Sequence, residues 1–177
     1  AAGAAEWQVD RTAAGNQVQF TSQVAGFSFA GRTDQVDGFL YWEGDSLFQR
    51  ATQIRVEVDL NSLNTGIGKR DRDMREVLDT RRYPRAVFAG TVLEHALVDS
   101  ASGQLAVQVK GTLALHGVER ELVAPATIRP EGESWRVDTE FALQLADYQI
   151  EAPSLAAFIK VGQQVQIKAG FAMRRVR

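Results

Sequence analysis

The chain has 177 residues, a formal net charge of −2 and no cysteine. Its length fits one domain with a sizeable core, and the missing cysteine excludes disulfides, thiolate metal sites and a cysteine nucleophile. The near-neutral charge argues against a nucleic-acid partner, and no apolar run reaches the roughly 20 residues of a membrane-spanning helix, so we expect no stable membrane insertion.

The first five residues, Ala-Ala-Gly-Ala-Ala, are small, like the residues around a signal-peptidase cleavage site. We therefore expect residues 1–6 to be a flexible remnant left after signal removal, and residues 7–177 to form a single domain. The same feature predicts a periplasmic or secreted protein. A cloning remnant is the alternative origin of these residues.

Alternation of apolar and polar residues dominates the chain. It is clear in residues 17–24, 54–60, 104–115, 135–145 and 161–173. Because successive side chains of a strand point to opposite faces, each segment has one buried and one wet face. That pattern is typical of antiparallel sheets, since buried parallel strands are apolar throughout.

Short turn signals separate the alternating segments, at residues 99–103, at His116-Gly117 and at residues 130–133. Eight or more strands joined by such turns favour a sandwich or a barrel. We therefore predict an all-β, antiparallel architecture. Residues 151–159, which include a proline, are expected to form a loop or a short helix over one end of the sheet.

One stretch has helical spacing. Between residues 69 and 79, the apolar residues Met74, Val77 and Leu78 fall on one side of a helix. Opposite charges four residues apart, at 71/75, 72/76 and 75/79, are expected to pair along it. Pro84 is expected to end it, because proline disfavours helical geometry in the preceding residue.

Reactive chemistry is sparse in this sequence. The only histidines are His95 and His116, and no hydrolase, zinc-protease or phosphate-loop motif is present. The residues alone leave two interpretations open. One is a barrel that encloses an apolar ligand, and the other is a solid-core barrel that acts through its surface.

Four motifs occur in a fixed order along the chain. They are Val36-Asp37-Gly38-Phe39 with Gly44, S-x-x-T-G-x-x-x-R-D at residues 62–71, Y-P-x-x-x-F at 83–88 and G-x-L-x-x-H-G-V at 111–118. Together they resemble the YceI family of bacterial proteins, over about residues 7–171. Two positions depart from the family pattern, since Leu145 stands in place of an arginine and Gln149 in place of a glycine.

The resemblance implies an extended, lipocalin-like antiparallel β-barrel of about eight strands with a short helix at its mouth. It also implies a periplasmic protein without catalytic activity, metal or cofactor. Its function would be to bind, transport or sequester a long hydrophobic chain, such as a polyisoprenoid, a polyprenyl quinone or a fatty-acid-like lipid. A homodimer would follow if one strand edge were left open.

We expect the ligand to contact the inner strand faces and the helical lid. The residues predicted to bind it are Phe20, Val24, Phe29, Leu40, Trp42, Val58, Met74, Leu78, Phe88, Leu115, Tyr148 and Phe158. Phe27 would replace Phe29 if Gly26 formed a bulge.

Two alternative functions stay open beside the resemblance. The first is a solid-core interaction protein of the cell envelope. The second is a lipid-modifying enzyme with an acid–base pair that depends on His116 or Asp147.

Overall fold

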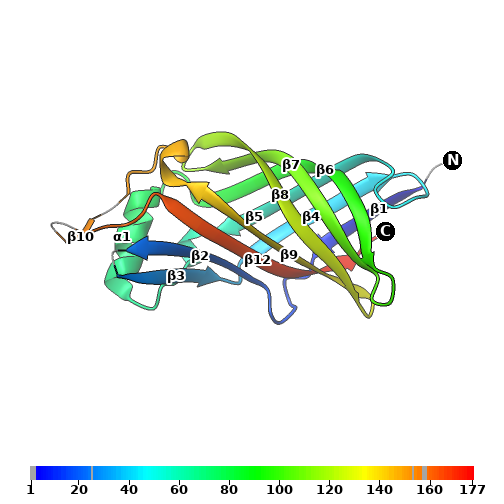
Figure 1. Ribbon diagram of the computed structural model, residues 1–177, viewed down its shortest axis with the longest axis horizontal. Helices are drawn as coiled ribbons and strands as arrows, with labels where there is room; N and C mark the ends of the chain where they lie inside the picture. The colour runs from blue at the N-terminus through cyan, green and yellow to red at the C-terminus, as the bar shows by residue number, and fades with distance from the viewer. Residues whose placement is uncertain (1–2, 25, 153, 157–158) are drawn as a thin grey trace.

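The computed structural model describes residues 3–24, 26–152, 154–156 and 159–177, and Figure 1 shows a long barrel of strands with one helix at an end. The large sheet comprises β1 (Ala4–Val9), β2 (Gln17–Val24), β3 (Phe27–Thr33), β4 (Val36–Glu43), β5 (Arg50–Asp59), β6 (Arg85–Asp99), β7 (Gln104–Leu115), β8 (Val118–Glu131), β9 (Ser134–Gln144) and β12 (Gln164–Arg175). The helical elements are α1 (Gly68–Leu78) and two single 3₁₀ turns, Leu60–Ser62 and Leu145–Tyr148.

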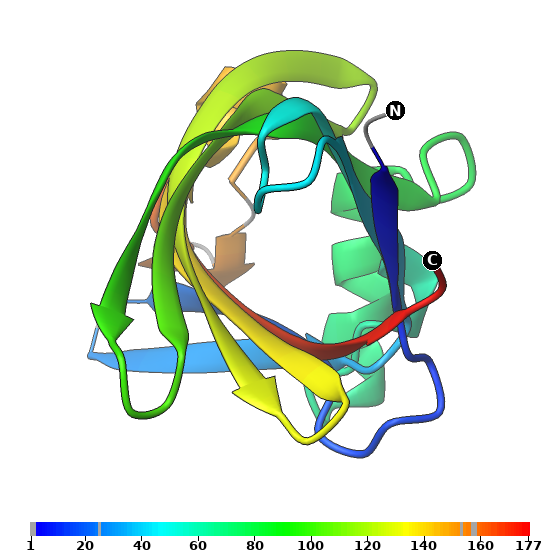
Figure 2. The same cartoon turned by 90° about the vertical axis from the view of Figure 1, so that its right-hand side faces the viewer.

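The sheet closes on itself. Its order is β1-β4-β5-β6-β7-β8-β9-β12, and β12 pairs back with β1 to complete a ring of antiparallel strands. Figure 2 shows this ring of strands viewed down the length of the barrel. The predicted all-β barrel with about eight strands and one short helix is thereby confirmed. A ring of this size leaves an interior that side chains can fill or that can hold one ligand.

The strand β12 has different neighbours along its two halves. Near its carboxyl end it pairs with β1, where Arg175 lies opposite Trp7, and in its first half it pairs with β2, where Val165 lies opposite Ser22. The β2–β3 hairpin therefore extends the barrel wall toward α1, at the left of Figure 1. The strand β3 is the last in the sheet order.

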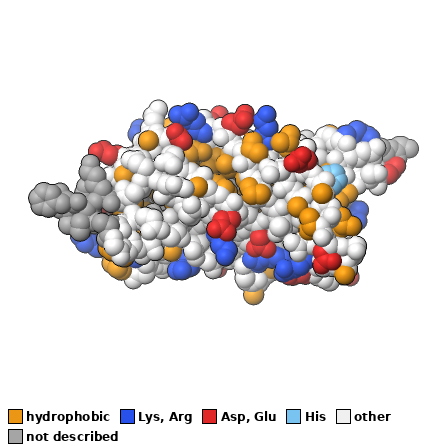
Figure 3. Space-filling model, viewed as in Figure 1, with side chains coloured by type: hydrophobic (Ala, Val, Ile, Leu, Met, Phe, Trp, Pro, Cys, Tyr) orange, Lys and Arg blue, Asp and Glu red, His pale blue; other side chains and the backbone are white. Residues whose placement is uncertain are grey.

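The alternating pattern of β7 places its side chains as predicted. Val107, Leu113 and Leu115 are buried inside the barrel, while Lys110 and Thr112 are exposed. On the face shown in Figure 3, acidic and basic side chains are mixed with one another over the outer surface of the barrel. The strand therefore has one apolar inner face and one polar outer face, as the period-two pattern requires.

A two-residue hairpin joins β7 to β8. His116 and Gly117 both have left-handed backbone angles, with φ of 58° and 75°, which suits the tightest hairpin turns. A Cβ atom at Gly117 would lie 2.6 Å from a ring carbon of Tyr83, so the position has no room for a side chain. The tight turn predicted here is confirmed.

The helix α1 begins where expected but ends for a different reason. Asp79 adopts a left-handed conformation, with φ of 52°, and its N–H donates to the carbonyls of Arg75 and Glu76. This is a left-handed cap, which stops a helix without proline. Our expectation that Pro84 ends the helix was wrong.

The ion pairs of α1 also differ from the expected set. Within the described residues, Lys69 pairs with Asp73 at 3.1 Å and Arg82 with Asp79 at 2.8 Å, but none of the three predicted pairs is formed. Asp71 instead accepts hydrogen bonds from Thr65. The three predicted ion pairs are therefore wrong, and one different pair, Lys69–Asp73, has the four-residue spacing.

The stretch between the second 3₁₀ turn and β12 contains a small separate sheet, at the α1 end of the barrel in Figure 1. Ser154–Ala156 (β10) pairs with Ile159–Lys160 (β11), so the described part of this stretch contains a pair of short strands where we expected a loop or a short helix. None of the helices in the described ranges is long and apolar enough to cross a membrane.

Candidate functional site

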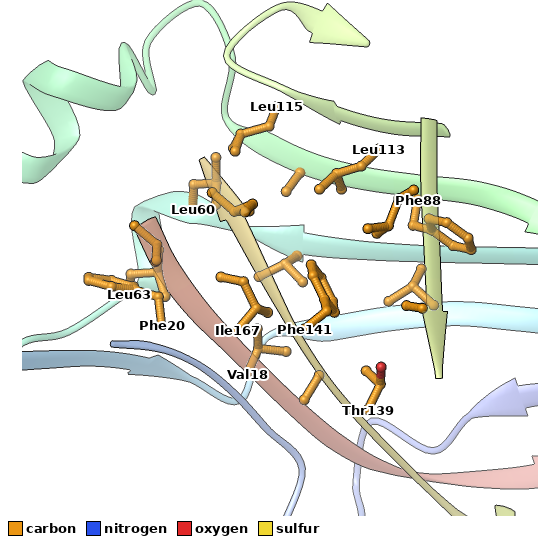
Figure 4. Close-up of a pocket in the computed structure, with 18 of the residues that line it drawn as sticks. Val18, Phe20, Leu60, Leu63, Phe88, Leu113, Leu115, Thr139, Phe141 and Ile167 are labelled. Carbon is orange, nitrogen blue, oxygen red and sulfur yellow. The ribbon is translucent and has the colours of Figure 1, made fainter. Parts of the chain in front are cut away.

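An elongated cavity of about 490 Å³ occupies the barrel interior. Ligand pockets commonly enclose about 300–1,000 Å³. The wall is almost entirely aliphatic and aromatic, and Figure 4 shows side chains from several strands converging on it. They include Val18, Phe20, Leu60, Leu63, Phe88, Leu113, Leu115, Phe141 and Ile167. The interpretation as a solid-core barrel is therefore wrong.

The cavity is long as well as apolar. On β7 the wall runs from Val107 to Leu115, and eight residue steps at about 3.3 Å span about 26 Å along the strand. A strand tilt of about 40° leaves about 20 Å along the barrel axis. One leaflet of a bilayer contributes about half of a 30 Å hydrocarbon core. The cavity can therefore accommodate an extended chain longer than one leaflet is thick.

Aromatic side chains cluster at the end of the barrel where the chain termini lie. Trp135 stacks on Trp7, with ring centroids 3.9 Å apart, and lies parallel to Trp42, at 6.1 Å. Phe48 meets Trp42 edge-on, and His95 meets Phe48 in the same way. We call these five residues the aromatic plug. None of them lines the cavity, but Trp7, Trp42 and Phe48 belong to the same core cluster as residues that do, such as Leu40 and Met173. The plug therefore lies just beyond the floor of the cavity.

Close backbone contact shapes the middle of the wall. Gly90 of β6 lies opposite Gly111 of β7. A Cβ atom at Gly90 would lie 2.3 Å from the carbonyl oxygen of Lys110, and one at Gly111 would lie 2.2 Å from that of Ala89. The two strands can therefore coil tightly around the cavity only because neither position carries a side chain.

The helix α1 forms the other end of the cavity. Met74, Val77 and Leu78 line it, as their helical spacing predicted, and Asp73 and Glu76 add charged groups from the same helix. Among the described residues, the charged side chains of the wall all come from α1. This end is therefore the mouth, where the cavity passes from apolar to polar surroundings.

A fixed loop precedes the helix. Asp71 accepts hydrogen bonds from the backbone N–H of Thr65, at 2.8 Å, and from its hydroxyl. Burial raises the pKa of Asp71, but the hydrogen bonds from Thr65 outweigh it, so the pKa lies below the usual value of 3.8. These hydrogen bonds tie the first turn of α1 to the loop before it.

Eight of the twelve predicted ligand-binding residues lie in the cavity wall: Phe20, Phe29, Leu40, Val58, Met74, Leu78, Phe88 and Leu115. Phe29 lines the cavity while Phe27 is 51 % exposed, so no bulge exchanges them. Phe158 lies outside the described residues. Their contact with a ligand stays a prediction.

Three predicted residues lie elsewhere. Trp42 faces inward like Leu40 but belongs to the plug, because it lies beyond the closed end of the cavity. Val24, the last residue of β2, is buried without lining the cavity. Tyr148 is buried in a 3₁₀ turn among other core residues, and this burial raises its pKa.

Several wall residues were missing from our prediction. Val18, Phe141 and Ile167 belong to alternating segments and share the apolar face of their strands, so the period-two pattern contained their signal. Leu60 and Leu63 lie in and just after a 3₁₀ turn. Leu60 also ends the alternating segment 54–60 and so carried the same signal, whereas no periodic pattern marks Leu63.

The residues named for an acid–base pair are placed away from the cavity. His116 shares a hydrogen bond of 3.1 Å through Nδ1 with the carbonyl oxygen of Tyr148, and neither His116 nor Asp147 lines the wall. Within the described ranges, no group of three acidic or histidine side chains is arranged to hold a metal ion. The enzyme interpretation therefore loses its two named candidates.

A family model described as a YceI-like domain matches residues 7–173. The chain belongs to the YceI-like family. Its relatives include a UPF0312 protein of Vibrio cholerae serotype O1, which is 29 % identical over 175 residues, with 94 % of this chain and 88 % of the relative covered. The UPF0312 protein of Pseudomonas savastanoi is 30 % identical over 162 residues, which cover 85 % of this chain and 79 % of that protein.

Solved structures share the YceI-like fold. BcnA of Burkholderia cenocepacia superposes with a TM-score of 0.73 at 17 % identity, covering 93 % of this chain and 98 % of that one. A polyisoprenoid binding domain from Saccharophagus degradans, implicated in plant cell wall breakdown, gives 0.71 at 22 % identity, covering 95 % and 97 %. At these identities the likeness establishes the barrel architecture.

Proposed function

We propose that the barrel binds one long hydrophobic chain in its cavity and shields it from water. The ligand class is a polyisoprenoid, a polyprenyl quinone or a fatty-acid-like lipid. The observation that carries the proposal is the apolar wall, which extends from the aromatic plug to α1. The solved relative that is named a polyisoprenoid binding domain supports the same class.

In an apolar site of this kind, the length of the bound chain affects affinity more than its methyl branching does. Each buried methylene contributes about 0.8 kcal/mol, and ordering a flexible chain offsets part of that gain. One added methyl group changes binding by only about 1–3 kcal/mol in an apolar pocket. The barrel is therefore suited to select chains that fit its length, with modest discrimination between isoprenoid and acyl chains.

The two ends of the cavity orient the ligand. The plug closes the floor with aromatic rings, and the charged groups of the wall lie on α1. The apolar tail therefore lies toward the plug and the polar end toward α1. The helix and the Thr65 loop flank the route by which the chain enters.

The proposed setting is the periplasm or the surrounding medium, where a long lipid chain needs a carrier or a sequestering protein. We infer binding and transport without catalysis, and no cofactor besides the lipid. A homodimer is part of the proposal, with pairing through β3, the terminal strand of the sheet order.

The test is to extract the purified protein with organic solvent and identify the released lipid by mass spectrometry. The delipidated protein is then refolded with polyprenyl and acyl lipids. Two neighbouring residues of β8 offer a matched control, because Ala124 lines the cavity while Val123 is 47 % exposed. Ala124→Trp should abolish lipid capture, and Val123→Trp should retain it. If the unmodified protein captures none of these lipids, the proposal fails.

A further inference from the structure

Among the described residues, one basic side chain lies in the wall of this mostly apolar cavity. Arg70 lines the mouth from the first turn of α1. A guanidinium carries five N–H donors, and a buried donor without an acceptor is costly. The Nη2 atom of Arg70 donates to the carbonyl oxygen of Thr65 at 2.7 Å, but its Nε atom is buried without a hydrogen-bond partner.

The carboxylates at the mouth do not neutralise this charge. Asp73 forms its ion pair with Lys69, and Asp71 accepts from Thr65. Glu76 lies six residues along α1, about 9 Å by the helix rise. No ion pair within 4.0 Å joins Arg70 to any carboxylate of the described residues. Within the described residues the guanidinium therefore forms no ion pair, although its charge helps to lower the pKa of the neighbouring Asp71.

Its surroundings hold the guanidinium in place. The central carbon lies 4.6 Å from the ring centroid of Phe29, and Phe20 meets Phe29 edge-on at 6.2 Å. The acceptor Thr65 is fixed by its hydrogen bonds to Asp71. The donors of Arg70 are thus ordered before any ligand arrives, which reduces the entropy lost on binding.

Another polar group of the wall lies close to Phe29. Ser22 pairs directly with Phe29 across β2 and β3, and it also lines the cavity. By contrast, the hydroxyl of Thr139, on β9, donates to the carbonyl of Pro125. The polar groups at the α1 end therefore include a hydroxyl and a positively charged group beside the same aromatic ring.

We propose that Arg70 binds the head group of the enclosed lipid, and that this head group is an anionic oxygen acceptor, a carboxylate or a phosphate. The inference rests on the proposed function, since it concerns the polar end of the same ligand. Charge-assisted hydrogen bonds from arginine to such groups are stronger than neutral ones. The head group remains at α1 while the tail extends toward the plug.

The experiment compares three probes with the same saturated chain: hexadecanoic acid, hexadecyl phosphate and hexadecan-1-ol. Binding to the delipidated full chain is measured by displacement of a fluorescent fatty acid. The variant Arg70→Met keeps the unbranched stem over Phe29 and removes the donors. Arg72→Met is the matched control, because Arg72 is exposed on the same helix and does not line the cavity.

The unmodified protein should bind the acid and the phosphate more tightly than the alcohol. Arg70→Met should weaken binding of the anionic probes about 10- to 100-fold and leave the alcohol nearly unchanged, while Arg70→Lys retains part of the preference. Arg72→Met should behave like the unmodified protein. The relative affinities of the acid and the phosphate decide which of the two anions is the better head group.

Two results would overturn the assignment. The first is equal binding of all three probes by the unmodified protein, and the second is an equal loss of all three in Arg70→Met, which would mark a purely structural arginine. Either result leaves lipid binding itself intact. If no probe binds the unmodified protein at all, the proposed function and the head-group assignment fail together.

Discussion

The substitution Ala124→Leu tests directly whether the barrel is hollow. Ala124 is 2 % exposed, lies opposite Val109 and lines the cavity. Leucine adds three carbons, each contributing about 0.8 kcal/mol on burial, while ordering its side chain costs about 0.5–1 kcal/mol. We expect the free energy of unfolding of the delipidated protein to rise by about 1.5 kcal/mol.

The sign of the change is decisive, because the same substitution in a filled core costs about 1–3 kcal/mol. Ala5 provides that comparison, since it is 5 % exposed in the core near the plug and does not line the cavity. Urea denaturation of both variants measures the two free energies, with m-values checked for two-state behaviour. If Ala124→Leu destabilises the protein as much as Ala5→Leu, there is no void beside Ala124 and the binding proposal loses its basis.

Three further predictions concern the plug, the hairpin and the helix loop. Trp42→Ala should lower the free energy of unfolding by about 3–5 kcal/mol, measured in urea, because it removes a stacked ring from the plug. Gly117→Ala should cost about 1–2 kcal/mol, measured by thermal unfolding, because its φ is 75° and Tyr83 occupies the Cβ position. Asp71→Asn should be destabilising above about pH 5, and its deficit relative to the unmodified protein should shrink as pH falls below 3.8.

Each prediction has a clear contrary result. A near-neutral Trp42→Ala would mean that the plug does not contribute to stability, and an unchanged melting temperature for Gly117→Ala would mean that the turn relaxes without strain. For Asp71, the pH dependence carries the test. A lowered folded-state pKa gives stability that is present above the unfolded pKa and lost as the carboxylate protonates, so a pH-independent deficit would contradict the role of its charge.

Sequence periodicity predicted which face of each strand is buried but not how far along the barrel a residue lies. Leu40 and Trp42 share one face of β4, yet Leu40 lines the cavity and Trp42 stacks in the plug. Depth depends on strand stagger and on which rings meet across the barrel. Both depend on contacts between segments far apart in the chain, and a local sequence pattern carries no information about such contacts.

The helix illustrates the same limit at short range. The spacing of Met74, Val77 and Leu78 predicted both the helix and the face that meets the cavity. The left-handed cap at Asp79 was not predicted, because an aspartate gives little sign that it will adopt such a conformation. The position of Arg70 in the cavity wall depends on its contacts with Thr65 and Phe29, which only the folded chain brings together.

All three tryptophans of the chain lie in the aromatic plug. Nearly all of the protein's intrinsic ultraviolet emission therefore originates at the floor of the cavity, remote from the helix. A short chain held at the mouth leaves that emission unchanged, while a chain long enough to reach the floor alters it. If the barrel binds a chain as proposed, the tryptophan emission of the unlabelled protein should report how far that chain extends.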